Sequence, residues 1–278
     1  MKGSWMGSLV YNVPASKVDL YRGCDIVVRS DDVTELAAAL LRCDPSKVRF
    51  IQLLATPADT SALEGSFYSL PLEIHLSDPA NQYTRLYDYA NLLDSHPIRV
   101  SLKLAPGFSK AVKLAVSLNF PVKLELDHPD AELIAELGSV LDLYLHRGNV
   151  RQPIEPFHSL LLSFCRDEPV SLWQIAEEDP SQVCFVTEGG EETISERFID
   201  QKELQPIRYA ELFQQQASSS VECSGCAFYG RCRGYFKWPD IEYDCAGVKQ
   251  IFATLESSAK ELQQDLAAFH EMEVQMQS

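Results

Sequence analysis

The sequence predicts an α/β protein built around a parallel β-sheet. Between residues 25 and 165, short β-rich runs alternate with amphipathic stretches of helical length. Most of the β-rich runs are apolar throughout or alternate with a period of two, as the strands of a sheet do. Repeated β-then-α units with connections of this size favour parallel strands. The six predicted strands suit either a partial barrel or a doubly wound sheet.

The predicted strands have the length of ordinary sheet strands, and helices fill the gaps between them. The strands are Asp25–Arg29, Val48–Leu54, Leu72–Leu76, Ile98–Leu104, Val122–Leu126 and Leu141–His146. The helices carry apolar residues at helical spacing and are Asp32–Arg42, Gln82–Asp94, Ser109–Leu118 and Asp130–Leu137. Residues 55–70 are predicted to form a loop.

The regular alternation ends near residue 165. Further helices are predicted at Ile154–Phe164, Val170–Glu177 and Arg208–Gln215, and a β-hairpin at Val183–Thr187 with Thr193–Arg197. The chain closes with a long predicted helix from Val248 to Met272. Its apolar stripe is typical of a helix that packs on the body of a protein, and less often of a partner surface.

Charge and hydropathy exclude several classes of partner. The chain has 24 basic and 40 acidic residues and a net charge of −16, whereas phosphate binding needs clustered Lys and Arg. No apolar run approaches the roughly 18–20 residues of a membrane span. The N-terminal MKGSWMGSLVYNVP also lacks the apolar core of a secretory signal. We therefore expect a cytoplasmic protein that binds neither nucleic acid nor membrane.

The strongest functional signal is a group of four cysteines in the pattern C-x2-C-x5-C-x12-C: Cys223, Cys226, Cys232 and Cys245. Four thiolates are the ligand set of a structural zinc or of an iron–sulfur cluster. In a cytoplasmic chain such spacing indicates metal binding rather than disulfides. The basic residues beside the group would compensate thiolate charge: Arg231, Arg233 and Lys237. The other cysteines lie far apart and are predicted to be buried apolar side chains: Cys24, Cys43, Cys165 and Cys184.

The cysteine segment resembles the C-terminal part of a SPASM domain, the iron–sulfur extension of radical SAM enzymes that modify peptides and proteins. Cys223, Cys226 and Cys232 match the first three cysteines of the family run C-x2-C-x5-C-x3-C, and Cys245 matches the final ligand. Phe236 stands where the family places a ligand of a second auxiliary cluster. The resemblance therefore implies one auxiliary [4Fe-4S] cluster, held by the four cysteines.

The same family places a partial (β/α)6 TIM-like barrel before the SPASM domain. The resemblance thus implies a barrel in residues 1–180 and a small metal-binding domain with a terminal helix in residues 181–278. Radical SAM enzymes carry C-x3-C-x2-C in the loop after the first strand, but the loop after the first predicted strand, 30–32, has no cysteine. The glycine-rich motif after the second strand is also missing. The chain resembles a pseudo-radical-SAM protein, which implies a non-catalytic partner of a peptide-modification system.

The resemblance implies that such a partner binds a precursor peptide or an active radical SAM maturase, with the cluster in a structural or electron-relay role. The alternative is a barrel enzyme of other chemistry with a structural zinc or iron–sulfur site. Its candidate residues lie at predicted strand ends, where barrel active sites collect: His75, Asp78, Lys103, Asp127, His128 and His146 with Arg147. An iron–sulfur nuclease completed by Cys24 fits poorly, because the nuclease core motif is absent and the charge is acidic.

Overall fold

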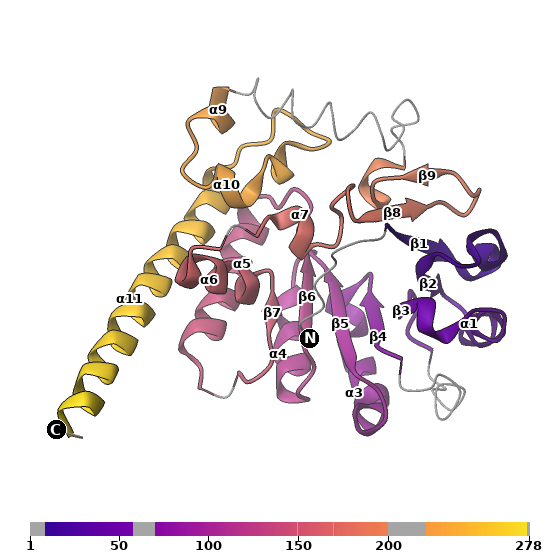
Figure 1. Ribbon diagram of the computed structural model, residues 1–278, viewed down its shortest axis with the longest axis horizontal. Coiled ribbons are helices and arrows are strands. Elements are labelled where there is room, and N and C mark those ends of the chain that lie inside the picture. Colours follow the sequence, from indigo (N-terminus) through magenta and orange to yellow (C-terminus); the bar gives the residue numbers. More distant parts are fainter. Residues whose placement is uncertain (1–8, 58–69, 149, 169, 200–220, 277–278) are drawn as a thin grey trace.

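A nine-stranded, mostly parallel sheet forms the centre of the protein in a computed structural model (Figure 1). The model describes residues 9–57, 70–148, 150–168, 170–199 and 221–276. The strands are β1 (Val10–Pro14), β2 (Asp25–Ser30), β3 (Val48–Leu53), β4 (Leu72–Leu76), β5 (Ile98–Lys103), β6 (Val122–Glu125), β7 (Ile154–Glu155), β8 (Val183–Val186) and β9 (Glu192–Thr193).

The strands from β1 to β7 are neighbours in chain order, and each pair is parallel. On its other edge, β1 pairs with β8, again in parallel. β9 pairs with β8 in the antiparallel direction and is the outermost strand on that side. Residues of the segment 181–278 therefore share one sheet with residues of the segment 1–180.

Helices connect the strands and cover one side of the sheet. The α-helices are α1 (Val33–Leu40), α2 (Pro79–Gln82), α3 (Leu86–Tyr89), α4 (Phe108–Ser117), α5 (Ala131–His146), α6 (Phe157–Arg166), α7 (Leu172–Ile175), α9 (Val221–Ser224), α10 (Tyr229–Cys232) and α11 (Ala246–Met276). Short 3-10 helices are η1 (Ala15–Tyr21), η2 (Pro45–Lys47), η4 (Tyr83–Arg85), η5 (Ala90–Asp94), η6 (Glu196–Phe198) and η7 (Tyr235–Lys237).

Local sequence sets where several helices begin. The carboxylate of Asp32 accepts hydrogen bonds from the backbone N–H groups of Thr34 and Glu35, which caps α1. Asp130 caps α5 by accepting from Leu133 N. Such caps satisfy N–H groups that the first helical turn leaves without partners.

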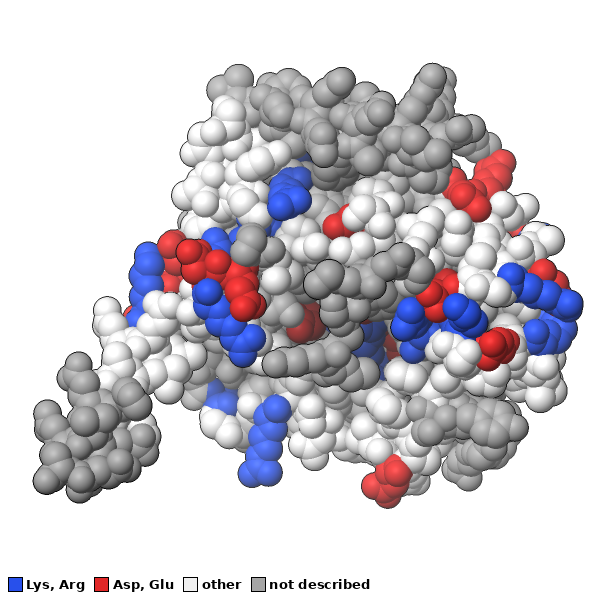
Figure 2. Space-filling view, in the orientation of Figure 1, with Lys and Arg blue, Asp and Glu red and all other residues white. Residues whose placement is uncertain are grey.

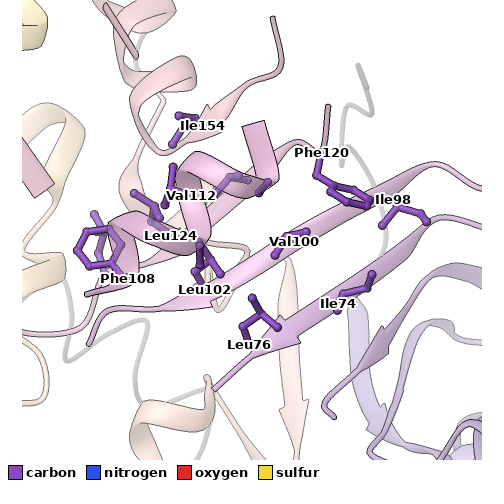
Figure 3. Packing of buried hydrophobic residues seen from close by; sticks show 14 of the residues in the cluster. Ile74, Leu76, Ile98, Val100, Leu102, Phe108, Val112, Phe120, Leu124 and Ile154 are labelled. Atoms are coloured by element: carbon purple, nitrogen blue, oxygen red, sulfur yellow. The ribbon is translucent and has the colours of Figure 1, made fainter. Parts of the chain in front are cut away.

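The helix-covered side of the sheet is apolar and forms the main core. Alternate residues of the strands point to this side, and Val28, Ile74 and Val100 are fully buried there. Phe108 and Val112 of α4 belong to the same cluster and lie beside Leu102 and Leu124 of the strands (Figure 3). Burial of each large apolar side chain stabilises the fold by about 1.5–3 kcal/mol, so this layer is the main source of stability.

The opposite side of the same strands is polar. Arg29, Gln52, Glu73 and Arg99 stand side by side in register on β2, β3, β4 and β5. Because side chains alternate between faces along a strand, these polar residues project away from the helix-covered core. The small apolar cluster of Val10, Val27 and Phe50 is separate from the main core.

Five of the six predicted strands are confirmed, and one is wrong. The run Leu141–His146 lies in α5, which continues through Gly138 to His146. Its apolar and polar residues alternate as in a strand, but Leu137, Val140 and Leu141 are buried at helical spacing. The structure adds two strands, β1 and β7, so Asp25–Ser30 is the second strand of the sheet and not the first.

The other predicted elements are confirmed with shifted ends or divided. The stretch Gln82–Asp94 forms a chain of short helices, whose turns alternate between α and 3-10 geometry. The stretch Ile154–Phe164 starts as β7 before α6 begins at Phe157. The hairpin forms as β8 and β9, although β9 is only Glu192–Thr193. The predicted helix Arg208–Gln215 and residues 58–69 of the predicted loop 55–70 lie outside the described residues.

The C-terminal helix α11 is longer than predicted, and its end projects away from the body (Figure 1). Its first half packs against α6 and α5, with Leu255 fully buried. At Gly247 a Cβ atom would come within 2.8 Å of Ile134 Cγ1, so glycine allows α11 to approach α5 closely. Among the described helices, none combines the length and apolar character needed to cross a bilayer.

Candidate functional site

The four predicted metal-ligating cysteines line one cavity. Cys223 lies in α9 and Cys232 ends α10, while Cys226 and Cys245 lie in the adjoining loops. The cavity measures about 30 Å³ and has aromatic walls that include Phe228, Phe236 and Phe252. Residues separated by 22 positions in the sequence are thus brought to one place, as the spacing predicts.

Backbone N–H groups surround the thiol of Cys232. Burial raises the pKa of Cys232 to about 11, while hydrogen bonds from the backbone of Phe236, Tyr235 and Gly234 act in the opposite direction. Arg233 and Gly234 both have positive φ angles, of 46° and 72°, which turn the chain back over α10. Donors aimed at a sulfur stabilise its thiolate form, the form that binds metals.

Two lysines and a carboxylate lie beside the cysteines. Glu222 Oε2 lies 2.5 Å from Lys237 Nζ, and its Oε1 lies 2.7 Å from Lys249 Nζ. Lys237 also donates to the backbone oxygen of Tyr243 at 2.6 Å. All three charged residues line the same cavity as the thiols. Their two positive charges against one negative charge partly compensate the charge of a tetrathiolate group.

The chemistry of this donor set fits a tetrathiolate metal or cluster, because it offers four sulfurs, N–H donors and nearby cations. The four thiols do not by themselves form a compact ligand set. Among the described residues, no three His, Cys, Asp or Glu side chains converge tightly enough to hold a metal ion. Every cysteine in the chain is a free thiol, so the four do not pair as disulfides.

A second and larger cavity, of about 510 Å³, opens on the polar side of the sheet. On its floor, His75 Nδ1 lies 3.0 Å from Glu125 Oε1, and Ser101 donates to the same oxygen at 2.5 Å. Burial alone lowers the pKa of His75, but the hydrogen bond and charge of Glu125 outweigh it, so the pKa is raised. Burial also opposes ionisation of Glu125, yet His75 and Ser101 bring its pKa down to about 2. An imidazole oriented by a carboxylate can act as an acid or a base.

A buried charge cluster lies beside this pair and consists of Glu73, Arg99, Lys123 and Glu177. Arg99 pairs with Glu73 and donates to Glu177 Oε1 at 2.7 Å, and Lys123 Nζ lies 3.1 Å from Glu177 Oε2. Glu177 has a positive φ of 61°, an unusual backbone conformation for a residue with a side chain. Through Glu177, the segment after α7 is tied to β5 and β6.

The structure brings together only some of the strand-end residues. His75, Lys103 and Asp127 line the polar cavity. His128 pairs with Asp127 at 2.9 Å, and its ring packs edge-on against Tyr243 with centroids 5.0 Å apart. Asp78 precedes α2 and accepts from Asn81 Nδ2 at 2.8 Å, so it holds a turn.

His146 does not join the cavity. It ends α5 at the surface, 3.7 Å from Asp142, because the segment predicted as a strand is helical. Arg147 follows it as the C-terminal cap residue of α5.

Sequence reasoning missed several residues of the cavity, among them Glu125, Glu177, Ser195 and Arg197. A signal for Glu125 was present. Polar residues occupy every second position of β4, β5 and β6, and this alternation marks a polar face on strands whose other face is apolar. No such signal existed for Glu177 or Arg197, because Glu177 follows α7 and Arg197 lies in the 3-10 helix η6, and these short segments reach the sheet only in the folded chain.

Replacing Glu125 by glutamine is expected to reverse the direction of the His75 pKa shift. Burial remains in the variant, but the carboxylate charge that outweighs it is lost, so the pKa of His75 falls below 6.5. NMR titration of the imidazole resonances measures this value. His146 is exposed and lies outside the cavity, so its resonances serve as the internal reference. An unchanged titration of His75 would contradict the pairing.

Comparisons with protein-family models, with curated proteins and with solved structures find no match for this chain.

Proposed function

We propose that this chain is a non-catalytic iron–sulfur partner protein of a peptide-modification system, with one [4Fe-4S] cluster at the four-cysteine site. The observation that carries the proposal is the shared cavity of Cys223, Cys226, Cys232 and Cys245. When bound, the cluster supplies metal–thiolate bonds that stabilise the C-terminal segment or a centre for electron relay. Because thiolate ligation couples metal binding to folding, a structural role alone is sufficient to explain the four ligands.

The order of the strands supports a degenerate (β/α)6 barrel as the frame of the protein. In a barrel, strands that are consecutive in the sequence are also neighbours in the sheet, and the helices lie on one side. Such a sheet curves in one direction. A doubly wound sheet instead reverses its order near the middle. The sheet runs from β1 to β7 without reversal, and its polar side encloses a cavity.

The cysteine positions support the loss of SAM cleavage. The loop after the first strand of the sheet is 15–24, which differs from the loop predicted from sequence, and Cys24 is its one cysteine. The spacing C-x3-C-x2-C occurs nowhere in the chain. Without three such thiolates the barrel has no ligand set for the radical-generating cluster.

The projecting end of α11 supports a protein partner. Leu262, Leu266 and Phe269 continue the three-and-four spacing of buried Leu255 and Ala259, yet their exposed fractions are 41%, 61% and 57%. Such a stripe on a free helix end is suited to packing against another helix. Acidic residues flank it, including Glu261 and Asp265, so a contacting surface with basic residues would complement it.

Metal and cofactor analysis of the anaerobically purified protein tests the proposal. We expect brown protein with about four irons per chain. Incubation with S-adenosylmethionine and a strong reductant should give no cleavage, because the radical-generating ligand set is missing. Colourless protein with stoichiometric zinc would contradict the cluster, and robust cleavage would contradict the non-catalytic assignment.

A second candidate is a barrel enzyme of other chemistry with a structural zinc or iron–sulfur site. The contact between His75 and Glu125 in the polar cavity favours it, since a carboxylate-bound imidazole is a common acid–base unit. This function would require turnover that depends on His75 and persists when the cysteine site is altered.

A further inference from the structure

The charged groups that line the polar cavity are nearly all paired with one another. Lys123 pairs with Glu177, and His75 pairs with Glu125. Arg29 lies 3.4 Å from Glu188. Arg197 lies 3.3 Å from Asp127 and 3.5 Å from Glu178. These pairs leave little net charge on the floor and side walls of the cavity.

Two charged residues of the lining remain without an ion pair within the described residues: Lys103 and Glu196. Lys103 ends β5, at the carboxyl edge of the sheet, and Glu196 begins η6. Both are exposed, so they stand at the opening of the cavity. Glu196 is close enough to Arg29 and His75 to influence the pKa of each, which places its charge toward the cavity.

A buried hydroxyl next to Glu196 also lacks a partner. Ser195 is 5% exposed and lines the cavity, and its Oγ atom makes no hydrogen bond in the described structure. A buried polar atom without a partner costs about 1–3 kcal/mol unless a ligand or water satisfies it. Ser195 therefore points independently to a bound group at this position.

Most of the remaining wall residues are apolar or aromatic, and the polar ones are Asn12, Gln52 and Thr187. Phe50, Phe185 and Ile194 line it, and the guanidinium of Arg29 covers the Phe185 ring at 4.0 Å. A volume of about 510 Å³ lies within the roughly 300–1,000 Å³ of small-molecule sites. Apolar walls with a few placed polar groups are the usual composition of such sites.

We propose that this cavity binds a zwitterionic ligand with an apolar side chain, namely an apolar amino acid or a short peptide with free termini. Lys103 binds the carboxylate, Glu196 binds the ammonium group, and Ser195 hydrogen-bonds the ligand between them. The site is separate from the cysteines, so this inference does not rest on the metal centre and either can fail alone.

Calorimetric titration of the full chain with leucine, Leu-Leu and Leu-Leu-Leu tests the proposal. At least one of these should bind saturably. Its N-acetylated and C-amidated forms should each bind about tenfold more weakly or worse, because each loses one charge-assisted contact. Failure of all three free forms to bind, or equal affinity for the blocked forms, would overturn the proposal.

Two variants assign the two ends of the ligand. Glu196→Gln should remove the preference for a free amine while keeping the preference for a free carboxylate, and Lys103→Gln should do the opposite. Lys110→Gln and Glu132→Gln change exposed charges on α4 and α5, outside the cavity, and should bind like the parent protein. Loss of both preferences in the control variants would show that the effect is one of overall charge and would overturn the assignment.

Discussion

Replacing Arg99 by leucine is expected to destabilise the protein by about 3–5 kcal/mol, because it removes the nearest cation from the buried carboxylate of Glu73 and one of the two cations that pair with Glu177. Arg99 pairs with both Glu73 and Glu177 on the polar side of the sheet. Glu73 is 1% exposed, so water cannot replace the lost partner. Lys123 remains, but its 3.9 Å approach to Glu73 is a weaker contact. Urea unfolding of the two proteins measures the loss.

The pH dependence of this loss distinguishes a charge effect from a packing effect. In the parent protein, burial opposes ionisation of Glu177 but Arg99 and Lys123 bring its pKa to about 2, below the usual 4.5. Its contribution is therefore full above pH 4.5 and is lost as the pH falls toward 2. Without Arg99, the pKa of Glu177 rises because burial is opposed by one cation fewer, so the variant loses less stability than the parent protein as the pH falls. The difference between the two proteins should shrink from pH 7 to pH 4.

A matched control separates this cluster from ordinary surface pairs, since basic and acidic side chains also lie next to one another on the exterior (Figure 2). Arg22 pairs with Asp19 at 2.6 Å, but the arginine side chain is 72% exposed. Exposed pairs contribute little, so Arg22→Leu should change stability by less than about 1 kcal/mol. A loss from Arg99→Leu that is equally small, or that does not change with pH, would contradict the interpretation.

Replacing Cys232 by serine is expected to prevent metal binding at the proposed four-cysteine site and to increase the mobility of residues 221–245. Serine oxygen is a poor ligand for a centre built from thiolates, and Cys232 is the thiol that receives the backbone hydrogen bonds. Binding of a structural metal to such a set contributes about 10–16 kcal/mol in zinc-finger peptides. Iron content should therefore fall to a small fraction, and hydrogen exchange should accelerate in this segment.

Cys43→Ser provides the control for this prediction. Cys43 follows α1 and donates its thiol to Ala39 O at 3.3 Å, far from the four cysteines in sequence and outside their cavity. The variant should keep the metal content of the parent. Unchanged metal content in Cys232→Ser would show that the thiol is not a ligand, and loss in both variants would point to general destabilisation.

The α/β class and the parallel sheet were predictable because their signal is local. Strands such as Leu72–Leu76 are short and apolar on one face, and the helix that includes Val112 has its own periodicity. The failures have physical causes. Leu141–His146 satisfies both a strand pattern and a helical pattern, and only its continuation of α5 decides between them. Val10–Pro14 contains Asn12 and ends in proline, two residue types that are depleted in strands, and its strand identity depends on β2 and β8 on its two sides.

The candidate sites were predictable to different extents. The grouping of the four cysteines was predictable because they are close together in the sequence. The polar cavity was predictable only in part. His75 and Lys103 could be placed at strand ends, whereas Glu177 and Glu196 reach the cavity from short segments outside the sheet. Positions that depend on tertiary folding of such segments leave no periodic trace in the sequence.

The pairing of β8 with β1 has a consequence for how this chain is made. Val10 pairs with Val183, so the edge of β1 stays open until more than 170 further residues have left the ribosome. An open strand edge is a template for pairing with other chains, and contacts between distant residues form slowly. The nascent protein thus passes through a long interval in which the first strand of its sheet is exposed on one side. Assistance by a chaperone during synthesis would act on this interval, and truncation before β8 would make it permanent.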